Sequence, residues 1–89
     1  MYILTLKDRQ DQGAYSVTNQ NGQQILYLFE QEDDAIRFSM MLEEEDYPSL
    51  DVVEISDDLI IKTCEIHGYE YTIITANDIV IPPNQNDII

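Results

Sequence analysis

The segment ILYLFEQEDDAIRFSMML, residues 25–42, contains the change of period that decides the fold. Its first five residues are all apolar, which is typical of an interior strand with both faces buried. From residue 31 onward the apolar side chains have helical spacing, and the apolar face consists of Ala35, Phe38, Met41 and Leu42. The sequence therefore predicts a central strand that leads directly into a helix, and this helix ends before Pro48.

Further strands are predicted by alternating or β-branched segments on both sides of this helix, over residues 2–6, 14–17, 51–55 and 69–74. Asn21-Gly22 supplies a tight hairpin turn before the central strand, because Asn and Gly accept positive φ values. Ser56 is a good N-cap and Gly68 a typical left-handed stop, so a second helix is predicted between them. The predicted order is β-β-β-α-β-α-β.

This order predicts an α+β fold, namely a two-layer sandwich that is a variant of the ferredoxin-like fold. The sheet is expected to have about five strands and to be mostly antiparallel. Because each strand–helix–strand crossover should be right-handed, we expect both helices on one face. Residues 1–76 form the single domain in this prediction, and residues 77–89 form a C-terminal edge segment followed by a disordered tail.

A sheet with both helices on one face leaves apolar side chains of its third and fifth strands on the other face. A contact with another chain would cover such a patch. Alternatively, the C-terminal segment, with Ile79 and Ile81, would fold back over it. The sequence leaves these two alternatives open.

Composition excludes several classes of function. The chain has 89 residues, 44% of them hydrophobic, which is enough for one folded domain. Its 18 acidic residues against four basic ones give a formal net charge of -14. Nucleic acids and anionic membrane surfaces are therefore not expected as partners, since both are bound largely through Lys and Arg.

The sequence also indicates a compartment. Cys64 is the single cysteine, so no internal disulfide can form. No signal peptide is recognisable at residues 1–4, and the longest apolar runs are far shorter than the roughly 20 residues of a membrane-spanning helix. We therefore expect a cytoplasmic protein.

The acidic residues form two clusters with different physical meanings. Glu32, Asp33 and Asp34 occupy the first turn of the first helix, where the helix dipole favours anions, and Arg37 follows at helical spacing. Glu43, Glu44, Glu45 and Asp46 lie at the C-terminal end of the same helix. There each acid opposes the dipole at a cost of a few tenths to about 1 kcal/mol.

Local stability explains the first cluster and does not explain the second. We rank a solvated face first for the residues Glu43 to Asp46, a docking surface for a basic protein second, and loose Mg²⁺ or Ca²⁺ binding well behind both. The spacing of a calcium-binding loop is absent, because Asp51, Asp57 and Asp58 lack the intervening Gly and the terminal Glu.

Cys64 and His67 are three residues apart on the second predicted helix and are the remaining candidates for chemistry. Two ligands are too few for a structural zinc site, and no other Cys or His is present. Cys64 is expected to be a small core residue, and His67 a favourable cation near a helix C-terminus. No phosphate-binding loop or dinucleotide motif occurs. We therefore predict no catalytic residue, no metal and no cofactor.

One further pattern extends over several motifs, at residues 28–38, 42–43, 46–48, 53–55 and 64–69. Together these motifs resemble a small acidic domain family of unknown function from cyanobacteria and plastids. The resemblance runs from about residue 2 to residue 74. It implies a cytosolic setting in an oxygenic phototroph and no catalytic or binding residue.

These observations favour a non-enzymatic protein-interaction or regulatory module. It would bind a protein partner, or a second copy of the chain, through the uncovered sheet face or through Glu43, Glu44, Glu45 and Asp46. The alternative is a domain that binds a small ligand or a divalent cation, by analogy with other ferredoxin-like sheets.

Overall fold

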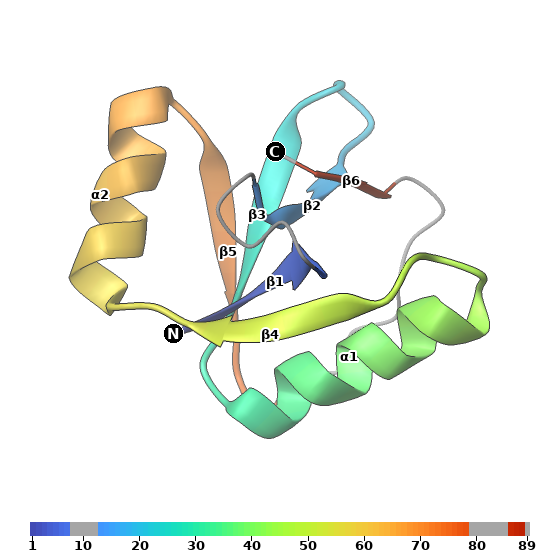
Figure 1. The fold of residues 1–89 in the computed structure, drawn as a ribbon. Coiled ribbons are helices and arrows are strands. Elements are labelled where there is room, and N and C mark those ends of the chain that lie inside the picture. Colours follow the sequence, from blue (N-terminus) through green and yellow to red (C-terminus); the bar gives the residue numbers. More distant parts are fainter. Residues whose placement is uncertain (8–12, 79–85, 89) are drawn as a thin grey trace.

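A computed structural model of the protein describes residues 1–7, 13–78 and 86–88 (Figure 1). In chain order its elements are β1 (Tyr2–Leu6), β2 (Tyr15–Thr18), β3 (Gln24–Phe29), α1 (Glu32–Glu44), β4 (Leu50–Glu54), α2 (Asp57–His67), β5 (Glu70–Ile74) and β6 (Asn86–Ile88). All strands of the predicted order β-β-β-α-β-α-β and both predicted helices are present. β6 is an addition to them.

β3 is the strand around which the sheet assembles, because it pairs with three others. β5 runs parallel to it, with Ile25 opposite Glu70 and Phe29 opposite Ile74. β2 and β1 are both antiparallel to it, and β1 meets it at the pair Tyr2 and Phe29. The remaining strands extend this arrangement into the order β4-β1-β3-β2-β6, with β5 on β3. The predicted α+β fold is confirmed, although the strand order is only approximately ferredoxin-like.

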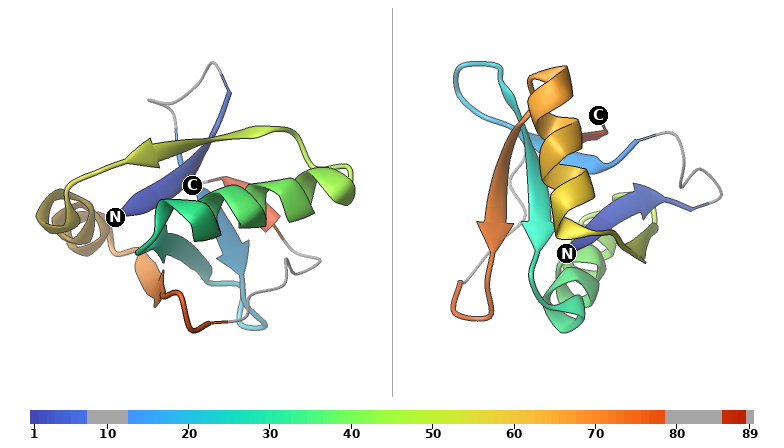
Figure 2. Two further views of the ribbon diagram at one scale, coloured as in Figure 1. Left: turned by 90° about the horizontal axis from the view of Figure 1, so that it is seen from below. Right: turned by 90° about the vertical axis from the view of Figure 1, so that its left-hand side faces the viewer.

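The two helices contribute to two separate cores, and these take alternate residues from the same strands. Leu4 of β1 packs with α1, whereas the neighbouring Ile3 packs with α2. In the same way Phe29 of β3 belongs to the α1 cluster and Leu28 to the α2 cluster. Successive side chains of a strand point to opposite faces, so α1 and α2 lie on opposite sides of the sheet (Figures 1 and 2). The prediction that both helices cover one face is wrong.

The direction of the two crossovers explains this difference. The chain passes from β3 through α1 to β4, and then from β4 through α2 to β5. Along the sheet, β4 and β5 lie on opposite sides of β3, so the second crossover runs in the reverse direction. Right-handed crossovers that run in opposite directions place their helices on opposite faces. Right-handedness alone, without this reversal of direction, predicts both helices on one face.

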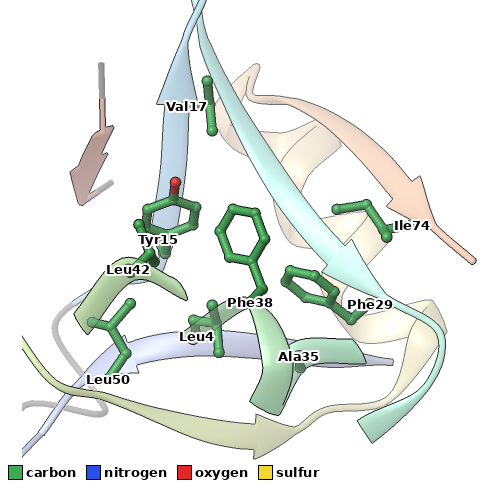
Figure 3. Packing of buried hydrophobic residues seen from close by; sticks show 9 residues of the cluster. All are labelled: Leu4, Tyr15, Val17, Phe29, Ala35, Phe38, Leu42, Leu50 and Ile74. Carbon is green, nitrogen blue, oxygen red and sulfur yellow. The ribbon is translucent and has the colours of Figure 1, made fainter. Parts of the chain in front are cut away.

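The larger core lies between α1 and the sheet and is rich in aromatic rings (Figure 3). Phe38 is at its centre, with its ring 5.4 Å from Tyr15, 5.6 Å from Tyr27 and 5.5 Å from Phe29, measured between centroids. Tilted and edge-on ring pairs at such distances add stabilisation to that of burial. Leu42, on the same face of α1, is completely buried.

The smaller core lies under α2 and consists of Ile3, Ala14, Leu26, Leu28, Ile60 and Cys64. Both helix-capping predictions for α2 are confirmed. The Ser56 hydroxyl accepts a hydrogen bond from the Leu59 N–H at 3.5 Å, and Gly68 has a left-handed φ of 71°. These caps set where α2 begins and ends, and so place Ile60 and Cys64 over the sheet.

The hairpin between β2 and β3 forms where the Asn-Gly turn predicts it. The side-chain oxygen of Asn19 accepts hydrogen bonds from the N–H groups of Asn21 and Gln23, both at 2.9 Å. Gly22 completes the turn with a φ of 79°. This turn fixes the register in which Ser16 lies opposite Leu26.

The C-terminal segment differs in part from its prediction. Asn77 and Asp78 lie in a turn, in which Asp78 accepts a hydrogen bond from the Thr75 N–H at 2.8 Å, rather than in an edge strand. Residues 79–85 and 89 lie outside the described residues. β6, which was predicted to lie in a disordered tail, pairs antiparallel with β2.

Replacing Phe38 with Ala should lower the free energy of unfolding by about 3–5 kcal/mol, because the change leaves a cavity between three aromatic rings. Met40→Ala is the matched control on α1, since the Met40 side chain is 57% exposed. It should change stability by less than about 0.5 kcal/mol. Urea unfolding followed by circular dichroism measures both. Equal losses in the two variants would contradict the assignment of Phe38 to the centre of the core.

Candidate functional site at the acidic end of α1

The structure places the four predicted residues together at the C-terminal end of α1. Glu43 and Glu44 are the last two helical residues, Glu45 is the C-cap, and Asp46 follows it. All four side chains are exposed. No basic residue occupies the last turn of α1, so nothing there offsets the negative end of the helix dipole.

The backbone of this acidic end is well ordered by hydrogen bonds. The Tyr47 N–H donates to the Leu42 carbonyl at 3.0 Å, and the Asp46 N–H donates to the Glu43 carbonyl at 3.1 Å. This pair of bonds is a Schellman motif, in which the residue after the C-cap adopts a left-handed conformation. Asp46 has that conformation, with a φ of 66°. The four carboxylates therefore project from a defined helix end rather than from a frayed one.

The end of α2 shows the usual solution to the same geometry. There the Tyr69 N–H donates to the Cys64 carbonyl at 2.9 Å, and the left-handed position is occupied by Gly68. His67, the last residue of α2, lies where a cation would be favourable. Compared with α2, α1 ends with a residue less suited to a left-handed φ and with charges of the unfavourable sign. The acidic end therefore lowers the stability of this end of α1.

The first turn of α1 agrees with its structural interpretation. Glu32, Asp33 and Asp34 all lie there, and an Asp34 carboxylate oxygen is 3.8 Å from the guanidinium of Arg37. Acids at a helix N-terminus and an ion pair at this spacing are both stabilising. This cluster needs no function to explain it.

Tyr47 connects the acidic end to the larger core. Its ring lies 6.0 Å from that of Tyr15, edge-on, and Tyr15 is buried. Burial raises the pKa of the Tyr15 hydroxyl above its usual value of 10.0, and the Glu45 carboxylate adds a smaller effect in the same direction. Glu45 is the smallest of these contributions, after burial and the neighbouring Tyr27 and Tyr47, so the link between the acidic end and the aromatic core is mainly the ring contact of Tyr47 with Tyr15. Sequence reasoning did not single out Tyr47 or Tyr15 for this role.

Cys64 and His67 do not form a thiol–imidazole pair suited to catalysis. Cys64 is completely buried in the smaller core, and burial, with a lesser contribution from Glu65, raises the pKa of its thiol. A raised pKa lowers the fraction of reactive thiolate. His67 is exposed and stacks on Tyr69, with 5.5 Å between the ring centroids. Cys64 is a core residue, as the sequence predicts.

The described residues also bear on a metal site, on the uncovered sheet face and on a membrane-spanning helix. Within residues 1–7 and 13–78, no three His, Cys, Asp or Glu side chains are arranged to hold a metal ion. The apolar sheet face expected to be free is instead occupied, because α2 packs on the side opposite to α1. In the same described parts, neither helix has the length and apolar character that crossing a bilayer requires.

A family model for a domain of unknown function, DUF3110, matches residues 1–84. The chain belongs to the DUF3110 family. This agrees with the resemblance to an uncharacterised family. No curated protein and no solved structure matches the DUF3110 domain, so no relative assigns a specific function to it.

Two exposed apolar residues of β5 were not identified as candidates from the sequence. Tyr71 and Ile73 of β5 are 37% and 39% exposed, although both are large and apolar. Their exposure follows from the position of β5 at the margin of the DUF3110 sheet, which depends on the strand order. β5 contains neither the Lys nor the Pro that often mark natural edge strands, so its sequence gave no signal of this position.

The same substitution at the two ends of α1 should have opposite effects on the stability of this DUF3110 domain. Glu44→Gln removes a charge that opposes the dipole, so it should raise the free energy of unfolding by a few tenths to about 1 kcal/mol. Glu32→Gln should lower it by a similar amount. Thermal unfolding at low salt measures both changes. Destabilisation by Glu44→Gln would show that the acidic end contributes to folding.

Tyr15 should make the domain sensitive to alkali. Since the folded state binds the Tyr15 proton more tightly than the unfolded state, the stabilisation is present below pH 10 and is lost as the pH rises above it. The free energy of unfolding should fall by up to about 1.4 kcal/mol per pH unit there. Tyr15→Phe should flatten this dependence in urea titrations between pH 8 and 12, while the exposed control Tyr71→Phe should leave it unchanged. An unaltered slope in Tyr15→Phe would show that a group other than Tyr15 causes the sensitivity to alkali.

Proposed function

We propose that this DUF3110 domain is a non-enzymatic protein-interaction module that binds a basic segment of another protein. The binding surface consists of Glu43, Glu44, Glu45 and Asp46, called the acidic end from here on. One observation carries the proposal. Four adjacent exposed carboxylates are held on a well-formed helix end where the dipole disfavours all of them and a left-handed backbone disfavours the last.

Electrostatics support a basic partner. Within the described residues, the ion pairs are those of Asp34 with Arg37 and of Asp57 with the Met1 amine, and neither involves the acidic end. Its carboxylates therefore face solvent with their charge uncompensated. The net charge of -14 adds a long-range field that attracts cationic partners and speeds their association.

The geometry also suits a short extended or helical segment rather than a single ion. The last two helical residues, the C-cap and Asp46 point away from a helix end in different directions, because helical residues are separated by about 100°. Several Lys or Arg side chains can each reach one carboxylate in such an arrangement. The resemblance to a cyanobacterial and plastid family supports a partner in the cytoplasm of a phototroph, or in the corresponding plastid compartment.

A binding experiment tests the acidic end directly. The probe is a fluorescein-labelled peptide of about ten residues, rich in Lys and Arg, and its anisotropy is measured at 50 mM salt. A variant that replaces Glu43, Glu44 and Glu45 with Gln and Asp46 with Asn should bind the peptide at least about fourfold more weakly, since four surface ion pairs of 0.2–1 kcal/mol each are removed.

The matched control removes four exposed acids elsewhere, by Glu32→Gln, Asp33→Asn, Asp58→Asn and Glu65→Gln. It has the same net charge as the first variant. Equal weakening in the two variants would show attraction by the overall charge and would refute a defined site. Affinity purification from a phototroph lysate, with the wild type and both variants as bait, then identifies the protein whose capture requires the acidic end.

A cation titration distinguishes the rival function. Isothermal titration of the wild type with Ca²⁺ or Mg²⁺ should show no saturable binding below 1 mM, because the carboxylates are not gathered around one point. Saturable binding in that range, lost in the acidic-end variant, would favour a cation site instead.

A further inference from the structure

The outer edge of β5 is open in the described parts of the chain. β5 pairs with β3 on one side and with no other described strand (Figure 2, right). It is five residues long and regular, and contains none of the lysines, prolines or bulges with which proteins commonly protect such edges. This edge therefore has the properties of a strand-pairing surface.

Two large apolar side chains lie on one face of this edge. Tyr71 is opposite Leu26 and Ile73 is opposite Leu28 in the parallel pair with β3. Leu26 and Leu28 belong to the core under α2, so Tyr71 and Ile73 lie on the same face as α2, at its margin. They are more than one-third exposed, whereas Ile74 on the other face is buried.

The backbone groups of these two residues also point outward. The Glu30 N–H donates to the Ile74 carbonyl at 2.9 Å, which shows that the polar groups of Ile74 face β3. Because the direction alternates along a strand, those of Thr72 and Glu70 face β3 as well. The N–H and C=O groups of Tyr71 and Ile73 then face the open edge.

We propose that two copies of this domain pair through β5, antiparallel, about a two-fold axis at Thr72. In this register Tyr71 of each copy lies opposite Ile73 of the other. The two residues exchange both backbone hydrogen bonds, so four outward-facing donors and four acceptors of the pair become satisfied. Each exposed ring also packs on a β-branched side chain, a favourable cross-strand pair.

The register about Thr72 is self-complementary, which is why the occupant is a second copy. On the other face, Thr72 meets Thr72 and each Glu70 meets Ile74 of the other copy, so no two charges are directly opposed. Shifting the axis to residue 71 or 73 pairs Tyr71 or Ile73 with itself and moves the other residue away from its apolar partner. A two-fold contact of this kind is isologous and closes as a dimer.

Net charge opposes this dimer and gives it a recognisable salt dependence. Each copy has a formal charge of -14, so bringing two together is repulsive over distances longer than the contact itself. Screening shortens that repulsion. Dimerisation should therefore strengthen with added salt, whereas peptide binding at the acidic end should weaken. The two surfaces can thus be tested independently.

Light scattering on the full chain tests the association. At 500 mM salt and high concentration we expect twice the monomer mass of 10.3 kDa, with a larger monomer fraction at 50 mM. Thr72→Glu places two carboxylates directly across the axis and should weaken dimerisation about tenfold. Ser49→Glu, which adds the same charge at an exposed position outside β5, should leave it unchanged. Circular dichroism confirms that both variants are folded.

Cysteine cross-linking tests the register. Residues that face each other at the axis have Cα atoms about 4.5 Å apart in a pair without mutual hydrogen bonds, within the range for a disulfide. Thr72→Cys should therefore give a covalent dimer on mild oxidation. Glu70→Cys is the control, because its two copies would be about 14 Å apart. The buried Cys64 is present in both variants.

The outcomes separate cleanly. A salt-strengthened dimer that Thr72→Glu disrupts and Thr72→Cys traps supports the proposal. A monomer at all salt and protein concentrations, without cross-linking at residue 72, overturns it. A dimer that cross-links at residue 70 and not at residue 72 overturns the register and with it the proposed pairing.

Discussion

The pairing of β3 is the constraint on which the rest of this structure depends. Its backbone forms hydrogen bonds with strands on both edges, and its side chains fill a core on each face. A slip of one residue would exchange Leu28 with Phe29 and move a large aromatic ring under α2, where a small core surrounds Cys64. The register of β3 is therefore fixed from both faces at once, and it determines where β1, β2 and β5 lie.

Reversal of the crossover direction at β4 has two further consequences. It sends α2 to the face opposite α1, so in the described part of the chain each face of the sheet is packed against a helix, unlike in the expected two-layer sandwich. It also brings the chain back across β3, so that β5 pairs with the edge of β3 that faces away from β1 and β4. β5 therefore lies at the margin of the sheet. The apolar surface that the sequence predicts on a face is thereby reduced to two side chains on an edge, Tyr71 and Ile73.

Features that depend on neighbouring residues could be predicted from the sequence, and features that depend on distant pairing could not. The hairpin at Gly22, the caps of α2 and the acidic end of α1 follow from local chemistry. Strand order involves contacts between segments far apart in the chain, and no pattern within β5 states which strand will pair with it. β6 is three residues long, with Ile88 as its one apolar residue and no apolar alternation, so its pairing with β2 gave no local signal. The exposure of Tyr71 could not be predicted from the sequence, because it also depends on the strand order.

The two proposed surfaces are compatible in one molecule because of where the sheet places them. The acidic end leads through Tyr47 into β4, and β4 is separated from β5 by β1 and β3. Three strand spacings of about 4.8 Å give roughly 14 Å. This separation exceeds the Debye length of about 8 Å at physiological salt. In a β5-paired dimer the acidic ends therefore lie at its outer sides, where they repel each other little and can each bind a partner. Self-association through an apolar edge thus leaves the charged surface free, which a dimer formed through α1 would not.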